Sequence, residues 1–352
     1  MHPQPRPRPQ TLPADAGSEA IQQALAELGC VHISGVIDPQ VLDAVEAELS
    51  DALRTRADAW HAAGRTQGGL ADGSRGLREL LTEAGAIPGF TSDLLAELDI
   101  TLPHAPFAVV TADDVFHLGN AVLDLITHER LLDVLATLLG DDIVASANQH
   151  CRIKLPTRRS DPDGQHRSAE APTLWHQDLV TQMPEADDSN VITCWVAGHD
   201  TKEEDGCLVV VTGRHHEGLY PWPFSPSFIA DLEAQCVPVP ARRGDIILMD
   251  KRTPHASLPN TSGQARWSFD LRFHPADQLT DRPWYPAIPV RNTSGPVVRD
   301  LADWQTQWEA ARDALIEDGR PLPGRPEWSQ PFADALISSW AAGGFPRAAS
   351  PT

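Results

Sequence analysis

Apolar residues recur at helical spacing in four parts of the chain. An apolar stripe that repeats every three to four residues is typical of a helix packed on a core. The spacing predicts helices over residues 18–28, from Pro39 through Leu53, within 115–139 and over 301–315. Gly29 and Gly140 follow two of these stripes and are expected to end them, since glycine is favoured just past a helix C-terminus.

Elsewhere the pattern alternates with a period of two, which is typical of strands with one buried face. The segments expected as strands are residues 31–37, 143–146, 149–155, 174–180, 191–197, 207–211, 245–249 and 266–273. Several short strands separated by turn residues, after a helical first third, predict a mainly β protein with flanking helices (α+β). The expected core is a β-barrel or sandwich.

Proline and glycine divide the chain into regions. Residues 1–17 are Pro-rich and are expected to be disordered. Residues 18–295 are predicted to form a single domain, and residues 296–352 a C-terminal extension of helical and irregular structure. Five glycines between residues 64 and 76 indicate a mobile loop, and a lid over a pocket is the alternative. The sequence leaves the roles of this loop and of the extension open.

Composition narrows the class of partner. The formal net charge is −21, which argues against nucleic acid because phosphate backbones are bound by clustered Lys and Arg. The chain has no apolar run long enough for a membrane span and no signal-peptide pattern at its start. Its five cysteines lack paired spacing and are expected to be reduced core thiols. These features predict a soluble cytoplasmic protein whose oligomeric state is unreadable.

Candidate chemistry gathers around residues 174–180. In a strand, His176 and Asp178 would point to one face while Gln177 turns away. His255 follows the expected strand 245–249 and would complete two imidazoles and one carboxylate, the facial triad of non-haem Fe(II) oxygenases. Arg266, eleven residues on, offers a guanidinium that can bind a carboxylate bidentately. The pair His215 and Glu217 also has ligand-like spacing, but it follows a glycine turn and is expected to be structural.

At this point the chain resembles the phytanoyl-CoA dioxygenase family of Fe(II)/2-oxoglutarate oxygenases, over roughly residues 20–290. The resemblance rests on His176-x-Asp178, His255, Ser257 and Arg266. It also rests on the stretch Glu204-Asp205-Gly206-Cys207-Leu208-Val209-Val210-Val211-Thr212-Gly213-Arg214-His215, on Arg243-Gly244-Asp245 and on Pro259-Asn260-Thr261-Ser262. One departure is Thr212-Gly213-Arg214-His215, where the family has Pro-Gly-Ser-His; it lies in a loop and leaves the candidate ligands unchanged.

The resemblance implies a double-stranded β-helix (jelly-roll) core with Fe(II) on His176, Asp178 and His255. It further implies that Arg266 and Ser257 bind the C5 carboxylate of 2-oxoglutarate, and that O2 is the second co-substrate. Other candidates come from expected strands that face this site. They are Thr193 and Lys154 for cofactor binding, and Gln149, Arg152 and Trp195 for the substrate pocket.

The resulting hypothesis is hydroxylation of an unactivated C–H bond of a small molecule. Asp178 argues against a halogenase, in which a small residue replaces the carboxylate, and a zinc hydrolase would not need Arg266 and Ser257. Desaturation, epoxidation and cyclisation on the same scaffold remain alternatives, as does a non-catalytic jelly-roll binding protein. The acidic charge favours a small metabolite, such as a natural-product intermediate, over an acyl-CoA. The sequence does not name the substrate.

Overall fold

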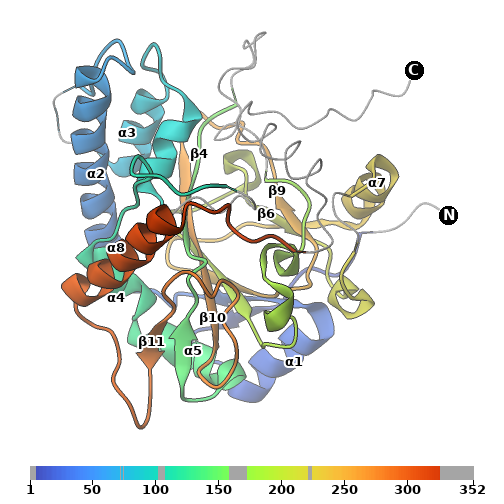
Figure 1. The fold of residues 1–352 in the computed structure, drawn as a ribbon. Helices are drawn as coiled ribbons and strands as arrows, with labels where there is room; N and C mark the ends of the chain where they lie inside the picture. The colour runs from blue at the N-terminus through green and yellow to red at the C-terminus, as the bar shows by residue number, and fades with distance from the viewer. Residues whose placement is uncertain are drawn as a thin grey trace.

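The computed structural model describes residues 5–71, 73, 75–101, 108–157, 173–220 and 224–325. Two β-sheets lie at its centre and helices cover one side of the larger sheet (Figure 1). The helices of the described part are α1 (Ser18–Leu28), α2 (Pro39–Ala62), α3 (Leu77–Ala84), α4 (Asn120–Ile126), α5 (Glu129–Leu139), α7 (Pro226–Gln235) and α8 (Leu301–Asp318). Within these residues no helix is both long and apolar enough to cross a membrane.

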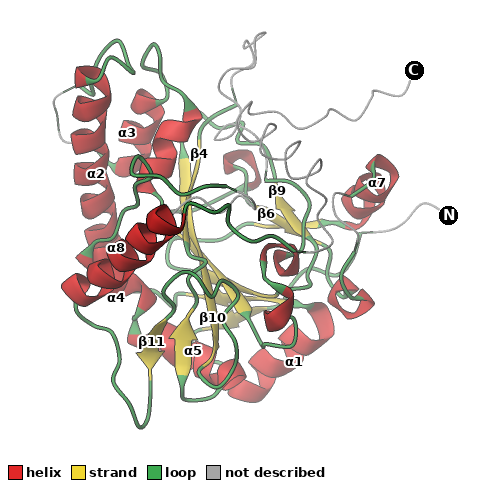
Figure 2. Cartoon of the chain, viewed as in Figure 1, coloured by secondary structure: helices red, strands yellow, loops and turns green. Residues whose placement is uncertain are grey.

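The larger sheet has eight strands in the order β1-β2-β8-β5-β10-β3-β11, with β4 also paired to β10. The smaller sheet has three strands in the order β7-β6-β9. Figure 2 shows β6 and β9 of this sheet side by side. The strand bounds are β1 (Thr11–Pro13), β2 (Cys30–Ser34), β3 (Ile143–Ala145), β4 (His150–Lys154), β5 (Ile192–Ala197), β6 (Leu208–Val210), β7 (Val237–Val239), β8 (Ile246–Asp250), β9 (His255–Ser257), β10 (Arg266–Pro275) and β11 (Ile288–Arg291).

Strand β10 organises the larger sheet because it is long enough to serve several neighbours. One edge pairs with β5 over Ser268–Phe273, while the other pairs with β4 at one end and β3 at the other. Its odd-numbered residues, Trp267 to Phe273, belong to the main apolar core shared with the helices. The even-numbered ones are polar from Arg266 to His274 and therefore occupy the opposite face of the strand.

That opposite face turns toward the smaller sheet. Residues of β5 and β8 form a second apolar cluster with β6 and β7, and Trp195 and Met249 are among its members. Polar residues of β10 and apolar residues of β5 thus share the space between the sheets. The two-sheet arrangement is the expected jelly-roll core, and the fold-class prediction is confirmed.

Several expected elements differ from the structure. The region 115–139 holds two helices rather than one, because His128 adopts an extended backbone and becomes the N-cap of α5. Residues 174–180 form no strand: His176 makes one isolated bridge to His255, and a 3₁₀ helix, η2 (Asp178–Thr181), begins directly afterwards. The expectation of disorder at residues 1–17 is wrong for the described part, since β1 pairs in parallel with β2.

Two regions keep open roles. In the Gly-rich loop, Arg65 forms ion pairs with Asp93 and Glu97, and the Gln67 amide donates to the Pro88 carbonyl, so its described part is held against neighbouring elements. Its use as a lid stays a prediction. In the C-terminal extension, Trp304 and Trp308 of α8 are buried in the main core. The residues after 295 therefore pack on the main core and form no separate one among the described residues. The domain boundary at residue 295 stays a prediction.

Candidate metal and 2-oxoglutarate site

Three candidate ligands meet at the edge between the sheets. Ligand atoms of His176, Asp178 and His255 all lie within 4.8 Å of one another. The isolated bridge brings the two histidines together, because the backbones of His176 and His255 exchange two N–H···O=C bonds of 3.0 Å. Gln177 keeps an extended backbone, so Asp178 reaches the same side as His176 although no strand continues there. Within the described residues no other His, Cys, Asp and Glu group of this kind occurs.

The ring nitrogens of both histidines have defined roles. Nδ1 of His176 lies 2.8 Å from the Leu174 carbonyl, and Nδ1 of His255 lies 3.0 Å from the Thr253 carbonyl. A carbonyl oxygen can only accept, so each Nδ1 carries the proton and each neutral ring keeps its Nε2 lone pair free. Burial lowers the pKa of His255 to about 4, which favours this neutral form. Two free imidazole nitrogens beside a carboxylate fit a divalent first-row metal.

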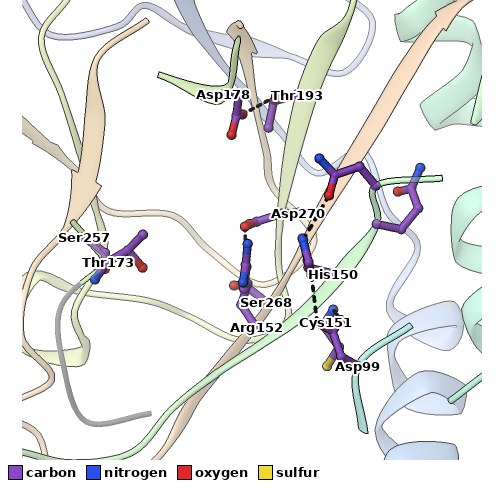
Figure 3. A network of polar contacts seen from close by, with 12 residues as sticks. Asp99, His150, Cys151, Arg152, Thr173, Asp178, Thr193, Ser257, Ser268 and Asp270 are labelled. Carbon is purple, nitrogen blue, oxygen red and sulfur yellow. Dashed lines mark hydrogen bonds and ion pairs between the residues drawn. The ribbon is translucent and has the colours of Figure 1, made fainter. Parts of the chain in front are cut away.

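Both oxygens of Asp178 are held. Thr193 donates its hydroxyl to Oδ2 at 2.5 Å (Figure 3), and Arg272 donates from Nη2 to Oδ1 at 2.6 Å. Burial alone would raise the pKa of Asp178, but opposing effects, of which the Arg272 charge is the largest, hold the pKa well below its usual value. Asp178 is therefore an ionised carboxylate whose orientation is set by two donors.

A second group of side chains carries positive charge. Arg266 and Lys154 face each other in the β10–β4 register and are each 3% exposed. Arg266 donates to the Ser268 hydroxyl at 2.6 Å, and Lys154 donates to the Ser257 hydroxyl and, at 2.8 Å, to the Leu258 carbonyl. No carboxylate of the described residues forms an ion pair with either cation, and Nε of Arg266 has no partner there.

Burial dominates the electrostatics of this pair. Burial lowers the pKa of Arg266 to about 10. Burial, and then the nearby Arg266 charge, hold the pKa of Lys154 well below its usual value. Two buried cations that have no ion-pair partner among the described residues are costly unless an anion joins them, so this arrangement fits a ligand carboxylate.

The remaining predicted residues divide into neighbours of the site and residues that brace the sheet. Trp195 is buried, with its ring centroid 5.9 Å from the Arg266 guanidinium carbon. Thr193 contacts the candidate ligand Asp178 rather than the cationic pair. Arg152 forms an ion pair with Asp270 at 2.8 Å (Figure 3), so its charge is already balanced.

Gln149 is a correction. Its amide donates to the carbonyls of Ser146 and Arg272 and accepts from the Arg272 N–H. A side chain that satisfies backbone groups in this way braces strand β10 and does not line a substrate pocket. His215 and Glu217 also stay apart: His215 bonds to the Ala26 carbonyl, and Glu217 binds Arg214 and Tyr220.

Arg272 is the functional residue that the sequence reasoning missed. The signal was present, because Arg272 follows Arg266 at an even spacing on a strand whose alternation was recognised. Its partner could not be read from the sequence, since 94 residues separate it from Asp178. A cavity of about 520 Å³ lined by residues such as Gln22, His215 and Arg252 contains none of the predicted site residues.

A jelly-roll core that holds two histidines and one aspartate beside a buried cationic pair defines the class of non-haem iron oxygenases that use 2-oxoglutarate. The family model for phytanoyl-CoA dioxygenase (PhyH) matches residues 25–268. The chain therefore belongs to the phytanoyl-CoA dioxygenase family.

Individual relatives are more distant. A phytanoyl-CoA dioxygenase domain-containing protein 1 homolog from Dictyostelium discoideum is 33% identical over 101 residues, which cover 24% of this chain and 34% of that protein. The match thus spans about a third of the relative's length. Two structures of the non-heme monooxygenase ThoJ, one apo and one with Ni, are similar in fold. Their TM-scores are 0.52 and 0.51 at 18% and 16% identity, and the alignments cover 85% of this chain and 99% of ThoJ.

Proposed function

We propose that this enzyme hydroxylates an unactivated C–H bond of a small-molecule metabolite, coupled to decarboxylation of 2-oxoglutarate. In this proposal His176, Asp178 and His255 hold Fe(II). Arg266 and Lys154, with Ser257 beside them, bind the distal carboxylate of 2-oxoglutarate. The observation that carries the proposal is the buried cationic pair, which has no counter-ion among the described residues.

The chemistry that bound Fe(II) and 2-oxoglutarate supply is oxidation of a C–H bond to an alcohol by O2, with succinate and CO2 as co-products. The chain itself contributes binding and orientation. Thr193 and Arg272 keep the Asp178 carboxylate ionised and aimed at the two histidines. Trp195 packs over the Arg266 guanidinium and keeps water from it, which strengthens its attraction for a carboxylate.

Charge guides the proposed substrate class. The cations near the triad are buried, and the chain carries a net charge of −21, which disfavours the phosphates of an acyl-CoA. A small metabolite, for example a natural-product intermediate, fits this charge distribution better. We place the reaction in the reducing cytoplasm, because the described cysteines are all free thiols.

Succinate release tests the proposal. Purified enzyme with Fe(II), 2-oxoglutarate and O2 is expected to form succinate, and a free metabolite that is the substrate should raise this rate. His255→Ala is the matched control and should form none. A rate raised by acyl-CoA thioesters alone would overturn the substrate class. A product carrying a new double bond, epoxide or ring in place of the hydroxyl would replace hydroxylation by the alternative outcomes.

A non-catalytic binding protein is the remaining alternative from another class. It would bind a ligand without forming succinate, and its ligand affinity would not depend on Asp178. The charged partners of Asp178 disfavour it, because a purely structural site has no need for an ionised carboxylate between two free imidazole nitrogens.

A further inference from the structure

The segment that carries Asp178 is held in place by the C-terminal extension. Residues 178–189, named here the Asp178 segment, contain two short 3₁₀ helices, η2 and η3 (Pro184–Ala186). Such short helices leave most of their carbonyl groups without intrahelical partners, so their geometry depends on donors from elsewhere. Three buried cations supply such donors: Arg282 donates from Nε to the Thr181 carbonyl at 3.0 Å, and Arg325 and Lys251 bind the other carbonyls described below.

Arg325 holds the end of the segment that lies nearest Asp178. Its Nη1 donates to the carbonyls of Leu179 and Gln182 at 3.2 and 3.1 Å. The same guanidinium forms two bonds of 2.8 Å with the carboxylate of Asp187. Arg325 is 3% exposed, so these charge-assisted bonds are little screened by solvent.

Lys251 holds the other end. Its ammonium donates to the carbonyls of Ala186, Asp187 and Ser189 at 3.1, 2.6 and 2.5 Å. This ammonium forms no described hydrogen bond with the carbonyls of Leu179 or Gln182, although the Lys251 backbone carbonyl accepts from the Leu179 N–H at 2.9 Å. Both cations contact Asp187, but only the Arg325 guanidinium also donates to the carbonyls of Leu179 and Gln182, in the half that begins at Asp178.

The path of the chain explains how Arg325 reaches this position. After α8, whose Trp304 and Trp308 are buried in the main core, the chain crosses the molecule (Figure 1). Leu322 is 1% exposed, and its amide donates to the Ala108 carbonyl at 2.8 Å. Arg325 lies three residues after Leu322, so the fixed position of Leu322 places Arg325 next to the Asp178 segment.

We propose that Arg325 is a positioning residue for the metal site, acting through the Asp178 segment, so that the C-terminal extension completes the site. The inference rests on the proposed role of Asp178 as a ligand. Without Arg325 the carbonyls of Leu179 and Gln182 lose a buried donor, and η2 would move or fray together with the carboxylate at its first residue.

The test combines hydrogen exchange with Ni(II) binding in the full chain. In Arg325→Gln, the amides of residues 178–183 should exchange faster in the metal-free protein, while those near Ser189 keep their protection. Ni(II) affinity by calorimetry should fall roughly 10- to 100-fold, the range usual for residues that orient a metal ligand. Arg325→Lys keeps the charge but not the forked geometry, so it should recover only part of the affinity.

Arg320→Gln is the matched control, since Arg320 lies in the same extension, is exposed and, within the described part of the chain, pairs with Asp318 alone. It should behave as wild type. Wild-type Ni(II) affinity in Arg325→Gln, or unchanged exchange in residues 178–183, would overturn the inference. If that variant does not fold, Asp187→Asn removes the carboxylate partner at a half-exposed position and must give the same two effects, smaller in size. Failure of the wild type to bind Ni(II) would instead refute the proposed function, while the exchange result would still decide whether Arg325 holds the segment.

Discussion

Two buried arginines on one face of β10 should respond oppositely to removal. Arg272 is paired with Asp178, whereas Arg266 has no carboxylate partner among the described residues. We predict that Arg266→Met leaves the metal-free protein as stable as wild type or more stable, while it weakens 2-oxoglutarate binding. Arg272→Met should destabilise the protein instead. A functional cation and a structural cation are thereby distinguished in the same strand.

The magnitude follows from the surroundings of Arg266. Burial lowers its pKa from 12.5 to about 10, and at 1.36 kcal/mol per pKa unit this is a cost of about 3 kcal/mol. Because the pKa is lowered in the folded state, the cost is fully present at every pH below about 10 and is lost only as the pH rises toward 12.5. Replacing Arg266 by Met removes this cost. It also removes the hydrogen bond to Ser268, which destabilises the folded state by about 1 kcal/mol. The free energy of unfolding should therefore rise by about 1–2 kcal/mol.

Binding should change in the other direction. Truncating one partner of a buried charge pair costs about 2–5 kcal/mol. At 1.4 kcal/mol per factor of ten, 2-oxoglutarate affinity should fall roughly 30- to 4,000-fold. Arg272→Met leaves Asp178 buried and unpaired, so its free energy of unfolding should drop by about 3–5 kcal/mol.

The assays are urea denaturation of the metal-free protein and calorimetric titration of the Ni(II)-loaded protein with 2-oxoglutarate. Lower stability of Arg266→Met together with wild-type 2-oxoglutarate affinity would refute the reasoning, because Arg266 would then be a structural cation. A stable Arg272→Met variant would show that the Asp178–Arg272 pair contributes little.

Three further predictions concern other residues. Gln149→Leu leaves backbone groups of Ser146 and Arg272 without a partner, so it should lower the free energy of unfolding by about 1–3 kcal/mol. The KM for 2-oxoglutarate should stay unchanged. A raised KM would show that Gln149 belongs to the binding site. Burial lowers the pKa of His199 to about 4, so the unfolded chain binds a proton more readily than the folded one, and stability falls as the pH drops from 6.5 toward 4. His199→Gln should reduce this loss of stability by about 3 kcal/mol between pH 7 and pH 4. An unchanged pH dependence of urea denaturation would contradict this prediction. Lys154→Met should weaken 2-oxoglutarate binding at least about tenfold in the same titration, because the ligand carboxylate loses one of two cations; wild-type affinity would leave Arg266 as the sole anchor.

The sequence predicted the strands and helices that have a strong period. Helix 18–28 agrees with α1 residue for residue, and the expected strands 149–155, 191–197 and 266–273 correspond to β4, β5 and β10 within a few residues. Helices α3 and α7 and the short strands β1, β7, β9 and β11 were missed. The strands have only three or four residues, which are too few to show a period. These elements depend on tertiary pairing.

The candidate site shows the same division. The convergence of His176 and Asp178 was expected from strand alternation, yet it arises from one bridge to His255 and an extended Gln177. Local spacing was enough because two extended residues suffice to bring the side chains to one face. Long-range partners could not be read in this way. Arg272 and Arg325 reach the Asp178 region from strand β10 and from the C-terminal extension, and only folding brings them there.

The most direct test of the account is an anaerobic titration of the metal-free protein with Fe(II), followed by 2-oxoglutarate, under visible absorption. The account predicts a weak charge-transfer band that appears only when both are present, because 2-oxoglutarate chelates a metal that the triad leaves partly open. The band should be absent in Asp178→Ala and should require far more 2-oxoglutarate in Arg266→Met. Fe(II) that binds without producing the band, or a band that persists in Asp178→Ala, would contradict the assignment of this site.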